Sequence, residues 1–524
     1  MDRRKFLLAS CAAGVTGLAQ TSASKKRPNI LLMFSDDHAY QAISAYGHKL
    51  NQTPNLDRLA KEGMLFTSAL VTNSICAPSR AVMLTGKYSH LNGVLDNVME
   101  FNPAQQTFPK LLQAAGYQTA MIGKWHLKSD PTGFDHWEVL PGQGNYYNPD
   151  FITKEGRHRR EGYVTDVVAD LAMEWLEKRD KTKPFMLFFQ QKAPHRNWMP
   201  GPKHLTDYED HHFPEPATLY DDYKNRASPA SKQAMEIGKD MVMNADLKVV
   251  SGDQAGGEGG GFRAEYNRMN AQQKAAWDAA YKRRGDDFQR LKPEGRDLTG
   301  WKYQQYMKDY LRCVASVDDN AGRVMKYLDD NKLTDNTLVV YMSDQGFYLG
   351  EHGWFDKRWI YEESIRTPLL MRWPGVVKPG SKTDLMVANV DMAQTFLEAA
   401  GVPEPTDMQG RSIVPILKGQ KPADWRKAFY FHYYELPVHQ VARHEGVRTD
   451  RYTLAHFYDT DEWELFDRQK DPNQMVSIYG KPEYAKIEAG LKADLARLKA
   501  ELKVPPPPPV VPAKKPGRAK PAAQ

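Results

Sequence analysis

The sequence predicts an α/β fold with a large, mainly parallel or mixed sheet sandwiched by helices. Short apolar runs that are typical of buried strands alternate along the chain with segments of helical periodicity. The chain has 524 residues, which is enough for one large α/β domain or for two domains. With 41% hydrophobic and 26% charged residues, its composition is that of a soluble globular protein.

The predicted strands are mainly apolar, as expected of strands buried on both faces. They span Ile30–Phe34, Thr119–Ile122, Phe185–Phe189, Leu338–Met342 and Leu369–Arg372. Between these runs, apolar residues recur at helical spacing. The predicted helices span Leu56–Lys61, Phe108–Ala115, Val164–Lys178 and Tyr303–Leu328.

Composition divides the chain into a large domain, 25–390, and a smaller C-terminal part. Within the first, residues 226–300 include the glycine-rich run SGDQAGGEGGGF, and we interpret them as an insertion with a flexible loop. From about residue 391, runs such as RKAFYFHYYELP and EWELFDRQKDP indicate antiparallel strands, which predicts an α+β subdomain over 391–503. The proline-rich residues 504–524 are expected to be extended and disordered.

Residues 1–24 are similar to an export signal, with a basic start, a short apolar stretch and small residues before the mature chain. The run RRKFL resembles a twin-arginine signal. LASC, ending at Cys11, also resembles a lipoprotein processing site, but the apolar run before it is short. We therefore favour a soluble periplasmic or secreted protein over one with a lipid anchor at Cys11, which stays the alternative. No later apolar run is long enough for a transmembrane segment.

The formal net charge of +6 belongs to the two ends of the chain. Residues 1–24 sum to +2 and residues 504–524 to +4, so the chain between them is neutral. A neutral chain argues against broad nucleic-acid binding, which needs a basic face. It leaves room for a local cationic pocket that binds a small anion.

Apart from Cys11, the chain has two cysteines, Cys76 and Cys313. In an exported protein, a disulfide between them is one interpretation. Cys313 lies in a predicted helix among apolar residues at helical spacing, which favours a buried packing role for it.

Polar clusters follow the first four predicted strands: SDDH, GKWH, HRNW and SDQG. In open α/β sheets, ligands bind at the carboxyl ends of strands, so these clusters are expected to meet at one edge. Asp36, Asp37 and Asp344 supply hard oxygen donors, and Gln345 adds a neutral carbonyl oxygen. This donor set suits calcium better than zinc.

The run CAPSR at residues 76–80, followed by LTG, resembles the C-x-P-S-R motif of type I sulfatases. Other segments resemble the family in its own order, from about residue 27 to 480: NILLMFSDD, GYQTAMIGKWHL, KAPHRNW, SDQGFYLGEHGWFDKRWIYEESIRTPLLMRWPG and DMAQTFLEAAG. The resemblance implies an alkaline-phosphatase-like fold. It also implies that a formylglycine-generating or equivalent maturation enzyme oxidises Cys76 to formylglycine, whose hydrate attacks sulfur and later expels sulfate.

The resemblance further implies a bound calcium ion and a set of catalytic residues. The implied calcium ligands are Asp36, Asp37, Asp344, Gln345 and the modified Cys76. Many family members carry Asn or His where this chain has Gln345, but Gln can still supply an oxygen. Arg80 is expected to hold the modified Cys76 from the first turn of a helix that Pro78 opens.

The other implied catalytic residues bind sulfate or move protons. Lys124 and Lys357 would bind the sulfate group. His126 would act as the base that drives sulfate release, and His195 would bind and protonate the leaving oxygen. Because Lys124 and His126 alternate around Trp125 at a strand end, both are expected to point to the same side.

The HRNW run and the aromatic C-terminal segment resemble the glycan-acting branch of the family. They are closest to bacterial N-acetylglucosamine-6-O-sulfatases that act on heparan-type glycosaminoglycans, so the expected substrate is a sulfated glycan. The candidate substrate contacts are Arg196, Trp198, His352, Arg358, His439, Arg443 and His444. An ordinary aromatic-rich sheet with exposed basic residues explains five of them equally well, all except His352 and Arg358. Glu351 is expected to form a local salt bridge.

Other functions stay open at this point. One alternative is a sulfatase whose substrate is another sulfated glycan or a small sulfate ester. A phosphodiesterase or phosphonate hydrolase of the alkaline-phosphatase superfamily would typically use Thr or Ser and two metals. A sulfated-glycan-binding protein with an inactive site would be expected to lack Cys76, Lys124 or His126, and all three are present.

Overall fold

The fold is taken from a computed structural model that describes residues 27–249, 260–436 and 438–506. The predicted export signal, residues 250–259 of the glycine-rich run and the chain beyond residue 506 lie outside these ranges. None of the described helices combines the length and the apolar composition needed to cross a lipid bilayer.

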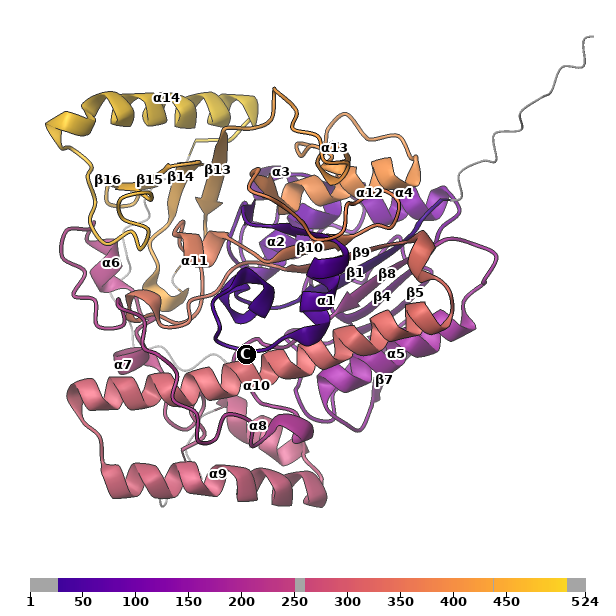
Figure 1. The fold of residues 1–524 in the computed structure, drawn as a ribbon, viewed down its shortest axis with the longest axis horizontal. Helices are drawn as coiled ribbons and strands as arrows, with labels where there is room; N and C mark the ends of the chain where they lie inside the picture. The colour runs from indigo at the N-terminus through magenta and orange to yellow at the C-terminus, as the bar shows by residue number, and fades with distance from the viewer. Residues whose placement is uncertain (1–26, 250–259, 437, 507–524) are drawn as a thin grey trace, which may run out of the picture.

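A ten-stranded mixed sheet forms the centre of the molecule (Figure 1), with the strand order β11-β2-β10-β9-β1-β8-β4-β5-β6-β7. The five central strands from β9 to β5 run parallel. They are β1 (Asn29–Ser35), β4 (Gln118–Lys124), β5 (His136–Leu140), β8 (Phe185–Gln190) and β9 (Thr337–Ser343). The predicted α/β class is confirmed, and each strand predicted in this region is present with one or two additional residues at its ends.

Shorter strands flank this parallel centre and make the sheet mixed. β10 pairs antiparallel with β9, and β6 and β7 form an antiparallel hairpin beside β5. The flanking strands are β2 (Met64–Phe66), β6 (Asp150–Thr153), β7 (Gly156–Arg159), β10 (Leu369–Arg372) and β11 (Ser381–Thr383). A separate two-stranded sheet joins β3 (Ala69–Leu70) to β12 (Val387–Ala388).

Helices cover both faces of the sheet because alternate side chains of its strands point to opposite sides. In β1, Leu31 and Met33 pack in one core with α1 (Pro54–Glu62), α5 (Val164–Lys178) and α10 (Gly295–Asp330). Ile30, Leu32 and Phe34 pack in a second core with α2 (Cys76–Thr85), α4 (Phe108–Ala114) and α12 (Met392–Ala400). Figure 1 shows the two helical layers on either side of the strands.

The helix α10 is longer than the predicted Tyr303–Leu328 and has 36 residues. Its first two turns, GRDLTGWK, consist largely of polar or half-exposed residues and lack the apolar periodicity on which the prediction relied. The pattern begins only where α10 reaches the core, so periodicity located the buried part of the helix and missed its exposed start.

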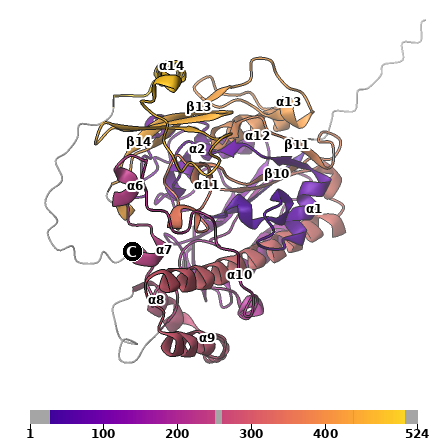
Figure 2. The same ribbon diagram turned by 60° about the vertical axis from the view of Figure 1, so that its left-hand side comes forward.

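The predicted insertion is mostly helical and packs against α10. It contains α6 (Pro229–Lys232), α7 (Ile237–Asp240), α8 (Gly260–Arg268) and α9 (Ala271–Leu291), and its end forms the start of α10. Asn270 and Gln273 form a capping box at the start of α9, and Trp277 and Tyr281 of α9 are buried in the core shared with α10. Figure 2 shows α8 and α9 lying along the outer side of α10.

The predicted C-terminal antiparallel sheet is present. Its strands lie in chain order: β13 (Ala428–Tyr433), β14 (His444–Thr449), β15 (Tyr452–Phe457) and β16 (Glu462–Asp467). Helix α14 (Ala485–Glu501) packs across these strands through Leu491 and Leu495 (Figures 1 and 2). The remaining short helices are α3 (Ser89–Asn92), α11 (Glu362–Ile365) and α13 (Val414–Leu417).

Candidate active site

The carboxyl ends of the central strands bring the predicted polar clusters together at one edge of the sheet. β1 and β9 pair in register through Ser35 and Ser343, so the residues that follow them, Asp36 and Asp344, lie side by side. The Cys76 thiol, at the start of α2, donates to Asp36 Oδ1 at 3.4 Å. Segments far apart in the sequence therefore build one buried site.

Three buried carboxylates, Asp36, Asp37 and Asp344, form the centre of this site. One oxygen of each lies within 4.8 Å of the others. Burial raises the pKa of Asp344 to about 7, helped by repulsion from Asp36. Burial also raises the pKa of Asp37 to about 6, although Lys357 opposes that shift. Three such charges held together favour a bound cation.

The amide of Gln345 completes the set of oxygen donors. Its Nε2 contacts Asp37 Oδ1, whereas its Oε1 is buried without a hydrogen-bond partner among the described residues. A buried carbonyl oxygen without a partner, beside three carboxylates, is suited to a hard cation. The residues present therefore fit the predicted calcium site.

Cys76 is the first residue of α2, two residues before the predicted start at Pro78. A proline is tolerated at the third helical position because the N–H that it lacks would have no acceptor within the helix. Burial, followed by the charge on Asp36, raises the pKa of the Cys76 thiol well above its usual value. An unmodified Cys76 is therefore protonated at neutral pH and a poor nucleophile.

Arg80 lies one turn further along α2 and ties four strands together. Its Nη2 donates to Asp36 Oδ2 at 2.8 Å and to Asp344 Oδ2 at 3.1 Å. Its Nη1 donates to the Lys124 carbonyl at 2.8 Å and to Gln190 Oε1 at 2.5 Å. The prediction that Arg80 belongs to the site agrees with these contacts, which show it holding the carboxylates in place.

Two buried lysines complete the charge balance of the site. Lys124 Nζ contacts Asp36 Oδ2, and Lys357 Nζ lies 2.7 Å from Asp37 Oδ1. With Arg80 they supply three positive charges against three carboxylates. A divalent cation added to this balanced cluster leaves a net positive charge, which favours an anionic substrate.

His126 reaches the site by a route that differs from the predicted one. The strand β4 ends at Lys124, and His126 has a φ of 56°, so strand alternation does not set its direction. Its Nδ1 is buried without a hydrogen-bond partner among the described residues. Burial, followed by repulsion from Lys124, lowers the pKa of His126 well below its usual value and keeps the ring neutral.

His195 points its Nε2 at the carboxylates. That atom lies 4.0 Å from Asp36 Oδ1 and 3.9 Å from Asp37 Oδ2. The Nδ1–H donates to the carbonyl of Arg196 at 2.6 Å, which fixes the ring orientation. Burial, followed by repulsion from Lys124, lowers the pKa of His195 well below its usual value.

Two of the predicted substrate contacts, Arg358 and His439, gather next to Lys357. His439 Nε2 lies 3.0 Å from Asp356 Oδ2, and Arg358 Nε lies 3.4 Å from Asp356 Oδ1. Arg358 also contacts Glu435, a residue of the C-terminal part. The two candidates therefore stand beside the charge cluster.

Trp198 and His444, two further substrate candidates, pack inside the protein. Trp198 is fully buried and packs against Tyr306. His444 is fully buried in β14, where its ring packs against Phe457 and its Nε2 accepts from the Ile360 amide. These contacts explain both side chains structurally, and their substrate role stays a prediction.

The other three substrate candidates are bound to acidic partners. These contacts are Arg196 with Asp246, Arg443 with Asp459 and His352 with Asp221. His352 is also fully buried. These contacts explain the side chains structurally and do not place them on a substrate.

Sequence reasoning missed several residues around the site. Gln190 is the last residue of β8, and the carboxyl-end rule that found the others would have found it too. Asn97 and Glu435 lie in loops without such a signal. Asn97 Oδ1 accepts from the backbone N–H of Ala77 at 3.0 Å. The backbone N–H of Asn97 donates to Glu435 Oε1 at 3.2 Å.

The two cysteines outside the signal region are both free and buried. The disulfide interpretation was therefore wrong, because Cys76 faces the carboxylates and Cys313 lies in α10. The packing role predicted for Cys313 is confirmed by its complete burial in the core.

A second pair of buried acids, Glu351 and Glu363, lies outside the carboxylate cluster. Glu351 accepts hydrogen bonds from Gln41 Nε2 at 3.1 Å and from the Leu349 amide at 2.6 Å, and the salt bridge predicted for it is absent among the described residues. The Oε2 atom of Glu363 has no hydrogen-bond partner there. Burial, followed by repulsion from Glu351, raises the pKa of Glu363 to about 8.

Glu363→Gln is expected to stabilise the protein at high pH. Because the folded pKa of Glu363 lies above its unfolded value, the wild type loses stability as pH rises from about 4.5 to about 8. The variant should therefore match the wild type at pH 5 and exceed its unfolding free energy at pH 9, by on the order of 3 kcal/mol. Urea unfolding at both values measures this. Glu398→Gln, on an exposed position of α12, is the control. If the unfolding free energies of Glu363→Gln and the wild type differ by the same amount at both pH values, the prediction is contradicted.

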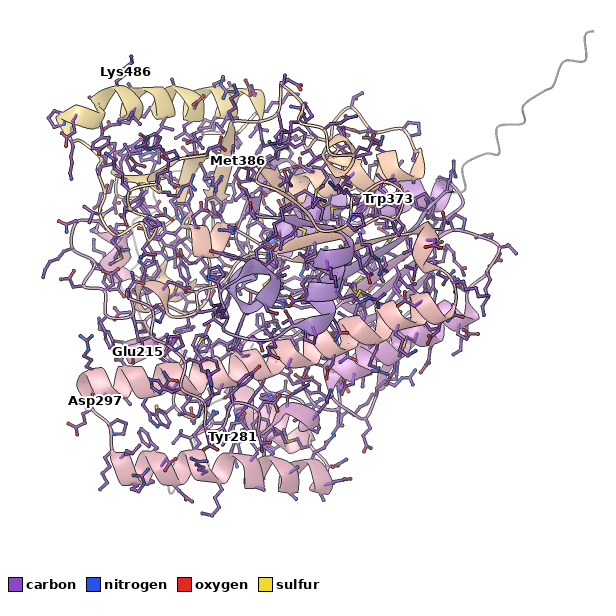
Figure 3. The ribbon with its side chains drawn as sticks, viewed as in Figure 1. Glu215, Tyr281, Asp297, Trp373, Met386 and Lys486 are labelled. Carbon is purple, nitrogen blue, oxygen red and sulfur yellow. The ribbon has the colours of Figure 1, made fainter. Side chains whose placement is uncertain are left out.

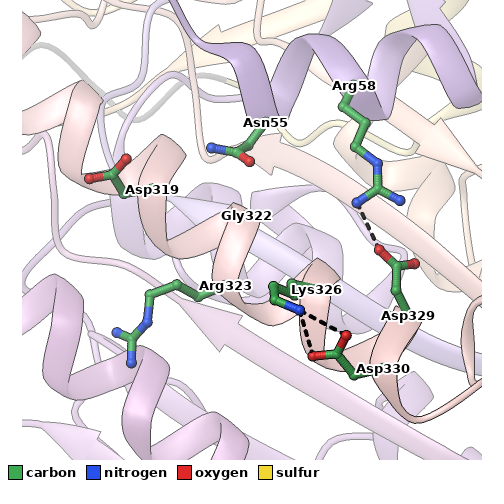
Figure 4. A pocket seen from close by; sticks show the side chains of 8 residues that line it. All are labelled: Asn55, Arg58, Asp319, Gly322, Arg323, Lys326, Asp329 and Asp330. Carbon is green, nitrogen blue, oxygen red and sulfur yellow. Dashed lines mark hydrogen bonds and ion pairs between the residues drawn. The ribbon is translucent and has the colours of Figure 1, made fainter.

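A surface pocket of about 520 Å³ lies between α1 and α10 (Figure 4). Four of its charged side chains pair with one another, Arg58 with Asp329 and Lys326 with Asp330. Because α10 ends shortly before β9 begins, this pocket lies at the amino ends of the strands. It is therefore separate from the charge cluster at the opposite edge.

The ten-stranded mixed sheet, together with the separate C-terminal antiparallel sheet, has an alkaline-phosphatase-like fold. Residues 28–402 match the sulfatase family, and residues 350–501 match the description "N-sulphoglucosamine sulphohydrolase, C-terminal". The chain belongs to the sulfatase family, whose members hydrolyse sulfate esters. The predicted family is thereby confirmed.

Among the similar proteins is an N-acetylglucosamine-6-O-sulfatase of Bacteroides thetaiotaomicron, 51% identical over 493 residues, with 92% of this chain and 87% of that protein covered. The human N-acetylglucosamine-6-sulfatase is 27% identical over 448 residues, with 80% and 70% covered. Among solved structures, BT4656 in complex with its substrate D-glucosamine-2-N,6-O-disulfate matches with a TM-score of 0.90 at 50% identity, covering 92% of this chain and 99% of that one.

Proposed function

We propose that this sulfatase removes the 6-O-sulfate of N-acetylglucosamine residues in heparan-type glycans. The observation that carries the proposal is the buried edge where the Cys76 thiol contacts one of three clustered carboxylates. The substrate assignment draws support from the Bacteroides relative and from the BT4656 complex, whose ligand carries a 6-O-sulfate.

The proposed chemistry requires two additions to the chain. A maturation enzyme would convert Cys76 to formylglycine, and one calcium ion would bind to Asp36, Asp37, Asp344 and Gln345. The hydrated aldehyde supplies an oxygen nucleophile, and the ion supplies positive charge next to it. The raised pKa values of Asp37 and Asp344, and the buried Gln345 oxygen, support the calcium assignment.

The cationic side chains bind and orient the sulfate group in this proposal. Lys124 and Lys357 are each paired with one carboxylate of the cluster, so their ammonium groups face the centre of the site. Donors fixed in this way stabilise negative charge that develops on the bridging oxygen without reorganising during the reaction. Arg80 keeps the carboxylates aligned.

The two histidines move protons at opposite stages. His126 is neutral and has an unpartnered Nδ1, so it can accept the proton whose removal drives sulfate release. His195 presents Nε2 to the carboxylates. A bound sulfate monoanion adds negative charge beside that atom, which favours its protonated form and allows it to donate to the leaving oxygen.

The sugar would lie on the side of Lys357, where Asp356, Arg358, Glu435 and His439 gather. Charged and polar side chains of this kind can hydrogen-bond sugar hydroxyl groups. We also propose that residues 1–24 direct export to the periplasm or beyond, and that the chain divides near residue 390 into the catalytic domain and its C-terminal subdomain.

Purified protein is expected to release sulfate from 6-O-sulfo-N-acetylglucosamine at least about tenfold more efficiently than from 2-O-sulfo-uronate or 4-O-sulfo-N-acetylgalactosamine. The reason is that the leaving sugar must fit against the polar residues that gather beside Lys357. Ion chromatography of released sulfate gives kcat/KM for each sugar. Equal efficiencies, or a preference for one of the other two sugars, would refute the substrate assignment.

A further inference from the structure

Residues 245–248 of the insertion are bound to the loop that carries His195. Lys248 Nζ donates to the carbonyls of Asn197 and Trp198 at 2.7 and 3.0 Å. Asn197 Nδ2 in turn donates to the Ala245 carbonyl at 3.1 Å. The two segments are about 50 residues apart in the sequence, so this contact belongs to the tertiary structure.

An ion pair between half-buried Arg196 and buried Asp246 strengthens the same contact. Arg196 donates to both oxygens of Asp246, at 2.7 and 2.6 Å, in a bidentate arrangement. The Arg196 guanidinium also lies over the ring of Phe355, 5.0 Å from its centre. Each residue of the loop from Arg196 to Trp198 therefore has at least one hydrogen bond to residues 245–248.

The ammonium group of Lys248 is itself held from the opposite side by α9 and α10. Its Nζ donates to Asp309 Oδ2 at 2.9 Å, and Arg284 donates to both oxygens of Asp309 at 2.7 Å. The Tyr281 hydroxyl donates to Asp309 Oδ1 at 2.8 Å, and Figure 3 labels this side chain between α9 and α10. All four side chains are buried, so the network is shielded from water.

The Trp198 amide donates to the His195 carbonyl at 3.2 Å, and the network meets the His195 side chain at the carbonyl oxygen of Arg196. This oxygen accepts the Nδ1–H of His195 at 2.6 Å and thereby sets the direction of Nε2. The next carbonyl along the chain, that of Asn197, accepts a hydrogen bond from Lys248. A shift of the loop would rotate the imidazole, and Nε2 would lose its position about 4 Å from Asp36 and Asp37.

We propose that Lys248 is a positioning residue for His195, and that the insertion serves to hold the catalytic loop in place. Lys248 does not touch the carboxylate cluster and acts only through the 195–198 loop. The proposal rests on the role of His195 in the proposed function, but it does not depend on which sugar carries the sulfate.

Lys248→Met is expected to lower kcat by about 30-fold, because displacing a proton donor by a fraction of an ångström has effects of this order. KM should change less than about twofold, since the sulfate-binding lysines are untouched. Lys248→Arg, which keeps the charge and donors, should recover part of the loss. An unchanged kcat in folded Lys248→Met would overturn the proposal.

Lys302→Met is the matched control because it separates positioning from stability. Lys302 is a buried lysine of α10 that also donates to two carbonyls of the insertion, Gly238 at 2.8 Å and Met241 at 3.0 Å. It makes no contact with the 195–198 loop, so its loss should lower Tm but leave kcat of the folded enzyme within about twofold. Equal kcat losses in both variants would show that Lys248 is merely structural.

A double-mutant cycle with His195→Ala tests the path of the effect. If Lys248 acts through His195, adding Lys248→Met to His195→Ala should cause little further loss of kcat. Losses that multiply would overturn the proposal. If Lys248→Met does not fold, Asp246→Asn loosens the same loop at Arg196 and takes its place in the cycle.

Failure of the proposed substrate is distinguishable from failure of the positioning role. A wild type inactive on 6-O-sulfo-N-acetylglucosamine would refute only the sugar assignment, and the cycle would then use another sulfate ester that the enzyme turns over. The positioning role fails only through the kcat pattern of the variants.

Discussion

Cys76→Ala is expected to abolish sulfate release, with a loss of about 10⁵-fold or more, because the variant lacks the precursor of the nucleophile. The fold should survive, since one sulfur atom is removed from a site held by Arg80 and the lysines. Sulfate release and thermal unfolding measure the two outcomes. Mass spectrometry of active wild type should find the Cys76 peptide about 18 Da lighter than expected for cysteine, as conversion of a thiol to an aldehyde requires.

Cys313→Ala is the matched control for this variant. Cys313 is equally buried and equally free of a disulfide, but it lies in the α10 core away from the carboxylates. Its replacement should lower stability slightly and leave activity intact. Retained turnover in Cys76→Ala, or only an intact thiol in active enzyme, would end the proposed mechanism.

Asp344→Ala is expected to remove the bound calcium and reduce activity by about 10³-fold or more, because the variant loses a metal ligand and an Arg80 partner together. Elemental analysis should find about one calcium per wild-type chain and none in the variant. Calcium should raise the Tm of the wild type but not that of the variant, since only the wild type binds the ion.

Asp318→Ala provides the comparison for Asp344→Ala. Asp318 is another buried aspartate with a raised pKa, of about 6 because of burial, and it accepts from the Leu56 amide at 2.8 Å at the start of α1. Its loss should destabilise the fold but preserve calcium binding and activity of the folded enzyme. Full calcium occupancy in Asp344→Ala would exclude Asp344 from the metal site.

The central sheet and the charge cluster could be predicted because both follow from short-range patterns. Apolar runs located the strands, and polar residues directly after them had to meet at one edge once the strands were parallel. Asp36 and Asp344 are the clearest case, since in-register pairing of β1 and β9 brings them together.

The contacts around this centre could not be predicted because they depend on tertiary structure. Nothing in the local sequence of Lys248 indicates that it reaches Asn197, and the same is true of Asn97 and Glu435. The side-chain direction of His444 could not be predicted for a related reason, since it is set by packing within the C-terminal sheet.

In the proposed mechanism, the complete burial of Cys76 would impose an order on the maturation of the enzyme. A modifying enzyme must take the sulfur into its own catalytic cleft, and the closed protein offers no solvent-accessible surface at that atom. Oxidation would therefore have to occur on the newly made chain, before the sheet assembles around it. A molecule that folds first would be trapped as an inactive thiol form. The yield of working enzyme would therefore depend on the rate of Cys76 oxidation relative to the rate of folding.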